Sequence, residues 1–277
     1  MSRFDTFIPR KAYAVCVDSD GCAMDTMNIK HFRCFGPCII DEWNLEPWRK
    51  EILDHWNVLN LFSRTRGINR FDGLARELRN INDNYTPIDG VEVFEEWAAK
   101  APELSNKAVE AMKDVHPVFA KALSWSQAVN RGIEELRDDE KLPFENVKEA
   151  LAEVHELADV VIVSSANEEA VLKEWEMYGL LDHVDLVCSQ TLGSKAFCIS
   201  KVLEKGYEKD HVLMCGDAPG DDKAASTNGV LYYPILVNHE GESWARFRSE
   251  AFAKFMDGSF AGSYQEALRD AFYENLK

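Results

Sequence analysis

An α/β fold is predicted for this chain: a parallel, Rossmann-like sheet interrupted by an all-helical insertion. Three observations predict it. Short apolar runs recur along the second half of the chain with amphipathic segments between them, which is the pattern of βαβ units. A first apolar run near the N-terminus ends abruptly in polar residues, as strands do at the ligand-binding edge of such sheets. Between that run and the later ones lies a long segment with helical periodicity and no convincing strand.

Five apolar runs are predicted to be buried parallel strands, because each is short and rich in residues that favour strands. They span residues 12–17, 160–163, 184–187, 212–215 and 230–233. Helices are predicted between the later strands at residues 147–157, 168–178 and 195–205. Right-handed crossovers would place the carboxyl ends of the strands along one edge of the sheet.

The insertion follows the first strand. Long amphipathic segments fill it as far as about residue 141, and they carry five of the seven tryptophans. These are Trp43, Trp48, Trp56, Trp97 and Trp125. We therefore predict an α/β core domain of residues 1–26 and 142–277 and a helical domain of residues 27–141. The tail from residue 240 onward is predicted to be helical and to pack on the sheet or on the insertion.

Composition and charge limit the classes of partner. The chain has 277 residues, of which 46% are hydrophobic and 29% charged, and its formal net charge is −17. Such an acidic chain is unsuited to binding nucleic acid or an anionic membrane, so neither is expected as a partner. The N-terminus has no apolar core like that of a signal peptide, and no stretch approaches membrane-spanning length, so a cytoplasmic location is expected.

The seven cysteines follow no regular spacing, and several fall inside predicted strands, which favours reduced, buried thiols. Cys34 and Cys38 have a spacing that occurs in metal sites. No further Cys or His pair completes a set of four ligands, so a zinc site is not predicted.

Polar residues stand at or shortly after the ends of four predicted strands. They are Asp18 and Asp20 after the first strand, Ser164, Ser165 and Asn167 after the second, Lys195 after the third, and Asp217 and Asp221 after the fourth. Because the carboxyl ends of parallel strands share an edge, these side chains should converge. Grouped carboxylates suit Mg²⁺, while an ammonium and a hydroxyl suit phosphoryl oxygens. Each motif alone also has a structural interpretation, such as a helix N-cap for Ser164 or a solvated charge for Lys195, but their joint order favours a phosphoryl-transfer site.

In these motifs the sequence resembles the haloacid dehalogenase-like hydrolases, a superfamily of aspartyl-phosphate phosphatases and phosphomutases. Its first motif, DxDGxxxDT, corresponds to residues 18–26, and its fourth, GDxxxDxxAA, to residues 216–225. The second motif is Ser164 after the apolar run VVIV, and the third is Lys195. All four occur in the family's order, so the resemblance is specific.

A closer resemblance is to the subgroup that contains β-phosphoglucomutase and small sugar-phosphate phosphatases. After the first motif the chain reads His31-Phe32-Arg33, as in that subgroup, and residues 67–74 (GINRFDGL) look like its cap stretch GVSRxDSL. The helical insertion therefore looks like a cap domain. The chain departs from the family at Ser19, where an apolar residue is usual, at Ala196, where Pro is common, and in the length of the insertion.

The resemblance implies a role for each motif residue. Asp18 would be the nucleophile and Asp20 the general acid and base, while Ser164 and Lys195 would hold the phosphoryl oxygens. Mg²⁺ would be bound by Asp18, the backbone carbonyl of Asp20 and Asp217, with Asp221 in support. The candidate substrate-binding residues are Arg70, His31, Ser165 and Asn167. Arg70 alone could equally be a helix-end ion pair, and His31 could either pack at the hinge or help hold the proton of Asp20.

The resemblance predicts a magnesium-dependent phosphatase that hydrolyses a small phosphate monoester, such as a sugar phosphate. A phosphomutase of the β-phosphoglucomutase type is the alternative, and a non-catalytic metal-binding or phospho-acceptor protein is less favoured. Asp20 argues against phosphonate hydrolases and transport ATPases, and the acidic pair Asp217 and Asp221 argues against dehalogenases. The sequence does not predict the natural substrate, the pathway or the oligomeric state.

Overall fold

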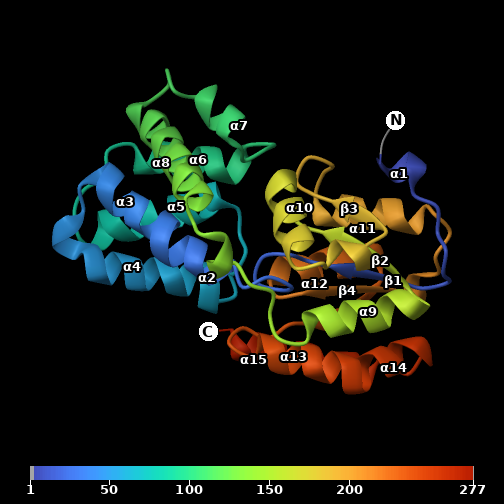
Figure 1. Ribbon diagram of the computed structural model, residues 1–277. Coiled ribbons are helices and arrows are strands. Elements are labelled where there is room, and N and C mark those ends of the chain that lie inside the picture. Colours follow the sequence, from blue (N-terminus) through green and yellow to red (C-terminus); the bar gives the residue numbers. More distant parts are fainter. Residues whose placement is uncertain (1–2, 277) are drawn as a thin grey trace. The chain divides into compact units, whose positions relative to one another are not determined.

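The computed structural model describes residues 3–276, so residues 1–2 and 277 of the predicted core domain lie outside it. The chain divides into two compact units. One unit joins the segment that ends at Met27 to the segment that begins at Asp138, and the other is Asn28–Arg137. Figure 1 shows that the first contains a sheet and that the second is drawn as helices.

The first unit is built on a five-stranded parallel sheet with the strand order β3-β2-β1-β4-β5. Its strands are β1 (Ala14–Val17), β2 (Asp159–Val163), β3 (Leu186–Cys188), β4 (Val212–Gly216) and β5 (Leu231–Pro234). The predicted α/β fold class and all five predicted strands are confirmed, with small differences at the strand ends. The strand order reverses between β1 and β4, and this switch point is where open sheets of this kind bind ligands.

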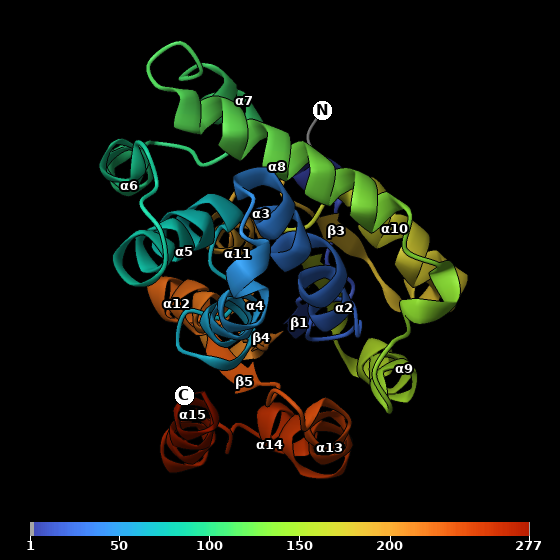
Figure 2. The same cartoon turned by 90° about the vertical axis from the view of Figure 1, so that its left-hand side faces the viewer.

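Helices cover both faces of the sheet. The α-helices are α1 (Arg3–Thr6), α9 (Val147–Leu157), α10 (Glu168–Met177), α11 (Lys195–Leu203), α12 (Pro219–Asn228), α13 (Glu240–Arg246), α14 (Phe252–Met256) and α15 (Ser263–Asn275). Short 3₁₀- or π-helical turns are η4 (Asp138–Glu140), η5 (Leu181–His183), η6 (Lys209–His211) and η7 (Phe247–Ala251). Figure 2 shows α11 and α12 on one face of the sheet and α9, α10, α13 and α14 on the other. The three helices predicted between the later strands are confirmed.

Burial on both faces explains the composition of the strands. Every residue of β1, β2 and β4 is buried, so apart from Asp159 at the start of β2 and Gly216 at the end of β4 these strands are continuous apolar runs and not alternating ones. The C-terminal tail packs on the sheet through aromatic pairs, with Phe247 against Tyr233 and Phe272 against Tyr232 at centroid distances of 5.0 and 5.8 Å.

The second unit is helical throughout. Its elements are α2 (Met27–Lys30, entered from the first unit), η1 (His31–Phe35), α3 (Gly36–Trp43), η2 (Glu46–Trp48), α4 (Arg49–Asn57), η3 (Val58–Phe62), α5 (Arg70–Asn84), α6 (Val91–Lys100), α7 (Asn106–Glu110) and α8 (Pro117–Glu134). Its core contains the fully buried rings of Trp56 and Trp125, whose centroids lie 6.0 Å apart. Helix α5 begins where Asn69 accepts a hydrogen bond from the N–H of Phe71, as an N-cap residue does.

No helix within residues 3–276 combines the length and the apolar character needed to cross a lipid bilayer.

Candidate active site

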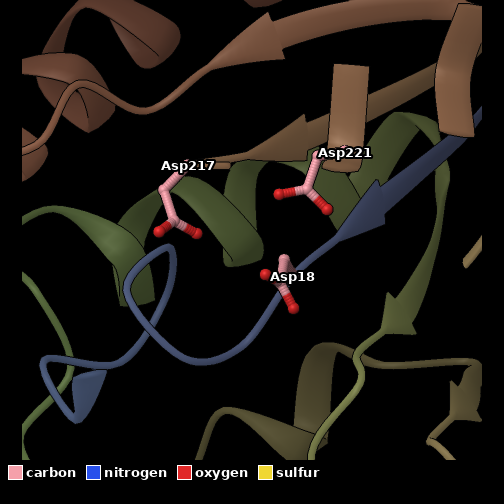
Figure 3. A group of neighbouring side chains, drawn as sticks. All are labelled: Asp18, Asp217 and Asp221. Carbon is pink, nitrogen blue, oxygen red and sulfur yellow. The ribbon is translucent and has the colours of Figure 1, made fainter. Parts of the chain in front are cut away.

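Three buried carboxylates meet beyond the carboxyl ends of β1 and β4. Asp18 directly follows β1, Asp217 directly follows β4, and Asp221 lies in the first turn of α12. Their carboxylate oxygens lie within 4.8 Å of one another, and Figure 3 shows the three side chains grouped around a common space. The sheet order creates this meeting, because β1 and β4 are sequence-distant neighbours at the switch point.

The backbone after β4 passes very close to Asp221. The Oδ2 atom of Asp221 accepts a hydrogen bond of 3.1 Å from the N–H of Ala218, which folds the side chain back over the turn. A Cβ atom placed on Gly216 would lie only 2.3 Å from Cγ of Asp221. The turn therefore requires glycine at position 216, because no neighbour can give way without moving a site carboxylate.

We expect Gly216→Ala to weaken severely the binding of any divalent cation at these carboxylates and to lower the melting temperature. Overpacking of this kind costs about 1–3 kcal/mol of stability. The matched control is Gly220→Ala in the same segment, where an added Cβ meets nothing within 4 Å. Isothermal titration with Mg²⁺ and thermal melting of both variants test this expectation. Equal behaviour of the two variants would show that the close approach has no functional consequence.

Lys195 lies among these carboxylates. Its Nζ atom is 2.6 Å from Oδ2 of Asp18 and 2.5 Å from Oδ1 of Asp221. Lys195 is the first residue of α11, and the helix start is held by Ser194, whose Oγ accepts a hydrogen bond from the N–H of Phe197 at 3.2 Å. Burial by itself would lower the pKa of Lys195, but the two carboxylates outweigh burial and raise that pKa above its ordinary value.

The site carries an excess of negative charge. Burial raises the pKa of Asp18 to about 6 although Lys195 opposes the shift, and burial also raises the pKa of Asp221. When ionised, the three carboxylates exceed the single ammonium by two charges. Hard oxygen donors with this excess fit a divalent cation such as Mg²⁺.

Asp20 occupies a different environment from Asp18. It is partly exposed, and its Oδ1 atom accepts a hydrogen bond of 2.5 Å from Oγ1 of Thr26. Its side chain does not belong to the carboxylate group that could hold a metal ion. Gly21 follows with a φ of +79°, so the chain turns sharply after Asp20 in a conformation that favours glycine. Two carboxylates separated by one residue thus have distinct surroundings, as distinct chemical roles require.

The residues after β2 occupy different positions. Ser164 is buried next to the end of β1, because β1 and β2 are paired, and its Oγ accepts a hydrogen bond of 3.1 Å from the N–H of Ala166. Ser165 is exposed. Asn167 is the N-cap of α10 and accepts a hydrogen bond of 3.2 Å from the N–H of Ala170. The N-cap residue of α10 is therefore Asn167 and not Ser164.

The two predicted substrate-binding residues of the helical unit both have partners inside that unit. The guanidinium of Arg70 donates to Oγ of Ser126 at 3.0 Å and to Oδ1 of Asn130 at 2.7 Å, and burial lowers the pKa of Arg70 to about 10. The Nδ1 atom of His31 accepts a hydrogen bond of 3.1 Å from the indole N–H of Trp56. A proton on the neutral ring of His31 is therefore on Nε2.

Sequence reasoning missed the residues that support the site from a distance. The indole N–H of Trp175 donates to Oγ of Ser19 at 2.9 Å, and the hydroxyl of Tyr232 donates to the carbonyl of Gly216 at 3.0 Å. Neither contact has a local signal, since each joins residues far apart along the chain. Thr26 could have been found, because it belongs to the first motif.

A family model matches the middle and later part of the chain. The sequence model described as haloacid dehalogenase-like hydrolase matches residues 95–233, half of the chain. The matched segment includes Ser164, Lys195, Asp217 and Asp221 and begins after Asp18 and Asp20. A search of curated proteins finds no match to this chain.

Solved structures resemble the chain in fold. A proposed phosphoglycolate phosphatase from Lactobacillus delbrueckii subsp. bulgaricus has 14% identity and a TM-score of 0.53, over 95% of this chain and 98% of its own. A haloacid dehalogenase-like family hydrolase from Streptococcus pneumoniae has 12% identity and a TM-score of 0.46, over 84% and 90%. A proposed β-phosphoglucomutase from Thermotoga maritima has 13% identity and a TM-score of 0.44, over 81% and 85%. At these identities the likeness concerns the fold alone.

Proposed function

This chain belongs to the haloacid dehalogenase-like hydrolases, and on that premise we propose that it is a magnesium-dependent phosphatase acting through an aspartyl phosphate. The proposed substrate is a small phosphate monoester, such as a sugar phosphate. The observation that carries the proposal is the convergence of Asp18, Asp217, Asp221 and Lys195 at the sheet switch point, with Asp20 two residues beyond the nucleophile.

In the first proposed half-reaction, a carboxylate oxygen of Asp18 attacks phosphorus and the bond from phosphorus to the leaving alcohol breaks. Asp20 donates its proton to the leaving oxygen, so that a neutral alcohol departs. Lys195 and Ser164 bind the other phosphoryl oxygens. Burial supports the attack, because water competes poorly for the carboxylate of Asp18, a residue that is only 5% exposed.

In the second half-reaction, Asp20 is a carboxylate and removes a proton from water. The resulting hydroxide attacks phosphorus, the bond from phosphorus to the carboxylate oxygen of Asp18 breaks, and inorganic phosphate is released. Thr26 keeps the carboxylate of Asp20 in place through its 2.5 Å hydrogen bond. The same residue therefore acts first as acid and then as base, which fits its partly exposed position.

Mg²⁺ would be held by Asp18, Asp217 and the backbone carbonyl of Asp20, with Asp221 in support. When bound, it neutralises charge on the transferring phosphoryl group. Asp221 suits the supporting role, because its two oxygens already accept from Lys195 and from the N–H of Ala218.

We also propose that the helical insertion, residues 27–141, is the cap that selects the leaving group, and that Arg70, His31, Ser165 and Asn167 contribute to substrate binding. The protein would act in the cytoplasm, since six of its seven free cysteines are buried, as expected of thiols that stay reduced. Its partners would be phosphorylated metabolites, not nucleic acid or membranes.

A phosphatase screen tests the proposed function. The purified protein is incubated with Mg²⁺ and with p-nitrophenyl phosphate, sugar phosphates, nucleotides and phospho-acids, and inorganic phosphate is measured. We expect phosphate release from at least one class of small monoester. Conversion of a sugar phosphate to its isomer without phosphate release would instead identify a phosphomutase. Lack of turnover with every compound would contradict the proposal.

We expect Arg70→Ala to lower kcat/KM for the best substrate of that screen by about ten- to a hundredfold, the usual value of a charged hydrogen bond. Hydrolysis of acetyl phosphate, which lacks a remote group, should change little. Asn130→Ala is the control, because it removes a partner of Arg70 and leaves the guanidinium. Equal losses on both substrates would make Arg70 a structural residue of the helical unit.

A further inference from the structure

Ser19 is the centre of the hydrogen-bonded loop after β1. Its N–H donates to Oδ1 of Asp18 at 2.8 Å, and its carbonyl accepts from the N–H groups of residues 22–24 at 2.8–3.3 Å. Its Oγ atom accepts from the indole N–H of Trp175 at 2.9 Å, and both side chains have no exposed surface. Backbone and side chain of this one residue thus connect the nucleophile, the loop and a distant helix.

Trp175 is a rigid partner for this loop. It lies on α10, the helix that follows β2 and Ser164, and it packs in the same core cluster as Val17 and Val171. The hydrogen bond to Ser19 therefore joins the loop that carries Asp18 to the helix that begins shortly after Ser164. Such a bond limits how far the peptide plane of Ser19 can tilt, and with it the carboxylate of Asp18.

The residue type at position 19 supports a specific role for the hydrogen bond between Ser19 and Trp175. The family that the chain resembles usually has an apolar residue at this place. An apolar side chain here would leave the indole N–H of Trp175 buried without an acceptor, which is unfavourable. Ser19 therefore supplies the acceptor that the buried indole N–H of Trp175 needs.

We propose that the Ser19–Trp175 hydrogen bond is a positioning device that fixes the Asp18 carboxylate relative to Ser164 and to the carboxylate group. Its effect on turnover rests on the proposed phosphatase function, whereas its effect on binding of Mg²⁺ does not. Partners of metal-ligating side chains typically change metal affinity or activity by about ten- to a hundredfold when they are removed. Misplacement of a reacting group by about 1 Å can cost about a hundredfold in rate.

The test compares Ser19→Ala, Trp175→Phe and the double variant. Binding of Mg²⁺ alone is measured by calorimetry, and kcat and KM are measured with p-nitrophenyl phosphate. We expect Ser19→Ala to weaken Mg²⁺ binding by about tenfold and to lower kcat by about tenfold, with little change in KM. Both values are at the lower end of the ten- to hundredfold range given above. Because both single variants break the same bond, the double variant should be no worse than the worse single variant.

Tyr233→Phe is the matched control. It removes another buried hydroxyl of the same unit, which donates to the carbonyl of Ser243 at 2.6 Å, and it leaves the loop after β1 untouched. We expect a lower melting temperature with unchanged kcat and Mg²⁺ affinity, which separates positioning from general stability.

Wild-type Mg²⁺ affinity in Ser19→Ala would overturn the inference, as would equal losses in Tyr233→Phe or multiplicative losses in the double variant. If the wild type binds Mg²⁺ but turns over no phosphate ester, the proposed function fails and the Mg²⁺ titrations alone decide the positioning role. A wild type that binds no Mg²⁺ would overturn both.

Discussion

Asp18→Asn should reduce phosphatase turnover to below a few per cent of the wild-type rate while the protein stays folded. The amide is nearly the same size as the carboxylate but is a poor nucleophile. Its carbonyl oxygen can still accept the hydrogen bond from the N–H of Ser19, while its NH2 group then faces the ammonium of Lys195. Lys195 keeps Asp221 as a partner, so we expect only the ammonium to shift and the fold to stay intact. Steady-state rates with the best substrate and thermal melting curves give the two measurements.

Asp210→Asn is the control for this substitution. It makes the same chemical change in the same unit, on an exposed residue of η6. We expect wild-type turnover from it. An Asp18→Asn variant that keeps more than a few per cent of the rate would rule out attack by this carboxylate, even if the phosphatase activity itself is real.

Removal of divalent cations should abolish turnover, and added Mg²⁺ should restore it. Without a cation, the buried carboxylates at positions 18, 217 and 221 carry more negative charge than Lys195 can balance, and the approach of an anionic phosphate is opposed. Activity is measured after treatment with excess chelator and again after a titration with Mg²⁺.

Ca²⁺ should inhibit in the same assay. It accepts more ligands than Mg²⁺ and in less regular geometry, so it can engage both oxygens of Asp18 and leave none for attack on phosphorus. Full activity in excess chelator would contradict the metal requirement. It would favour the dehalogenase-type chemistry that the acidic pair Asp217 and Asp221 otherwise argues against.

The fold was predictable because burial on two faces leaves a strong mark on a strand. The runs at residues 160–163 of β2 and 212–215 of β4 are apolar at every position, and each run is soon followed by polar residues where the chain leaves the sheet. Helix α9 was predicted with its observed ends, because apolar residues at helical spacing and the following strand fix both limits. The predicted bounds of β3, residues 184–187, differ slightly from the observed bounds, Leu186–Cys188, because a strand of three residues leaves only a weak sequence pattern.

The hydrogen-bond partners of the candidate substrate-binding residues could not be predicted from local patterns. Asn167 matched the expected polar strand end, yet its side chain caps α10. Arg70 matched a short stretch of a known cap, yet the structure gives its guanidinium hydrogen-bond partners on α8. A short polar motif specifies the residue type, whereas the partners of a long side chain depend on helices that are distant in the sequence.

The sequence by itself determined the α/β fold class, the inserted helical segment and the residue types of the candidate site, because periodicity and motif spacing are local properties of the chain. The tertiary structure alone decided which side chains meet. It brought Lys195 to within 2.6 Å of Asp18, required glycine at position 216 beside Asp221, and gave Ser19 its partner Trp175, which is 156 residues away. Such pairings follow from strand order and from helix packing, which depend on the whole buried core and leave no pattern in any single segment.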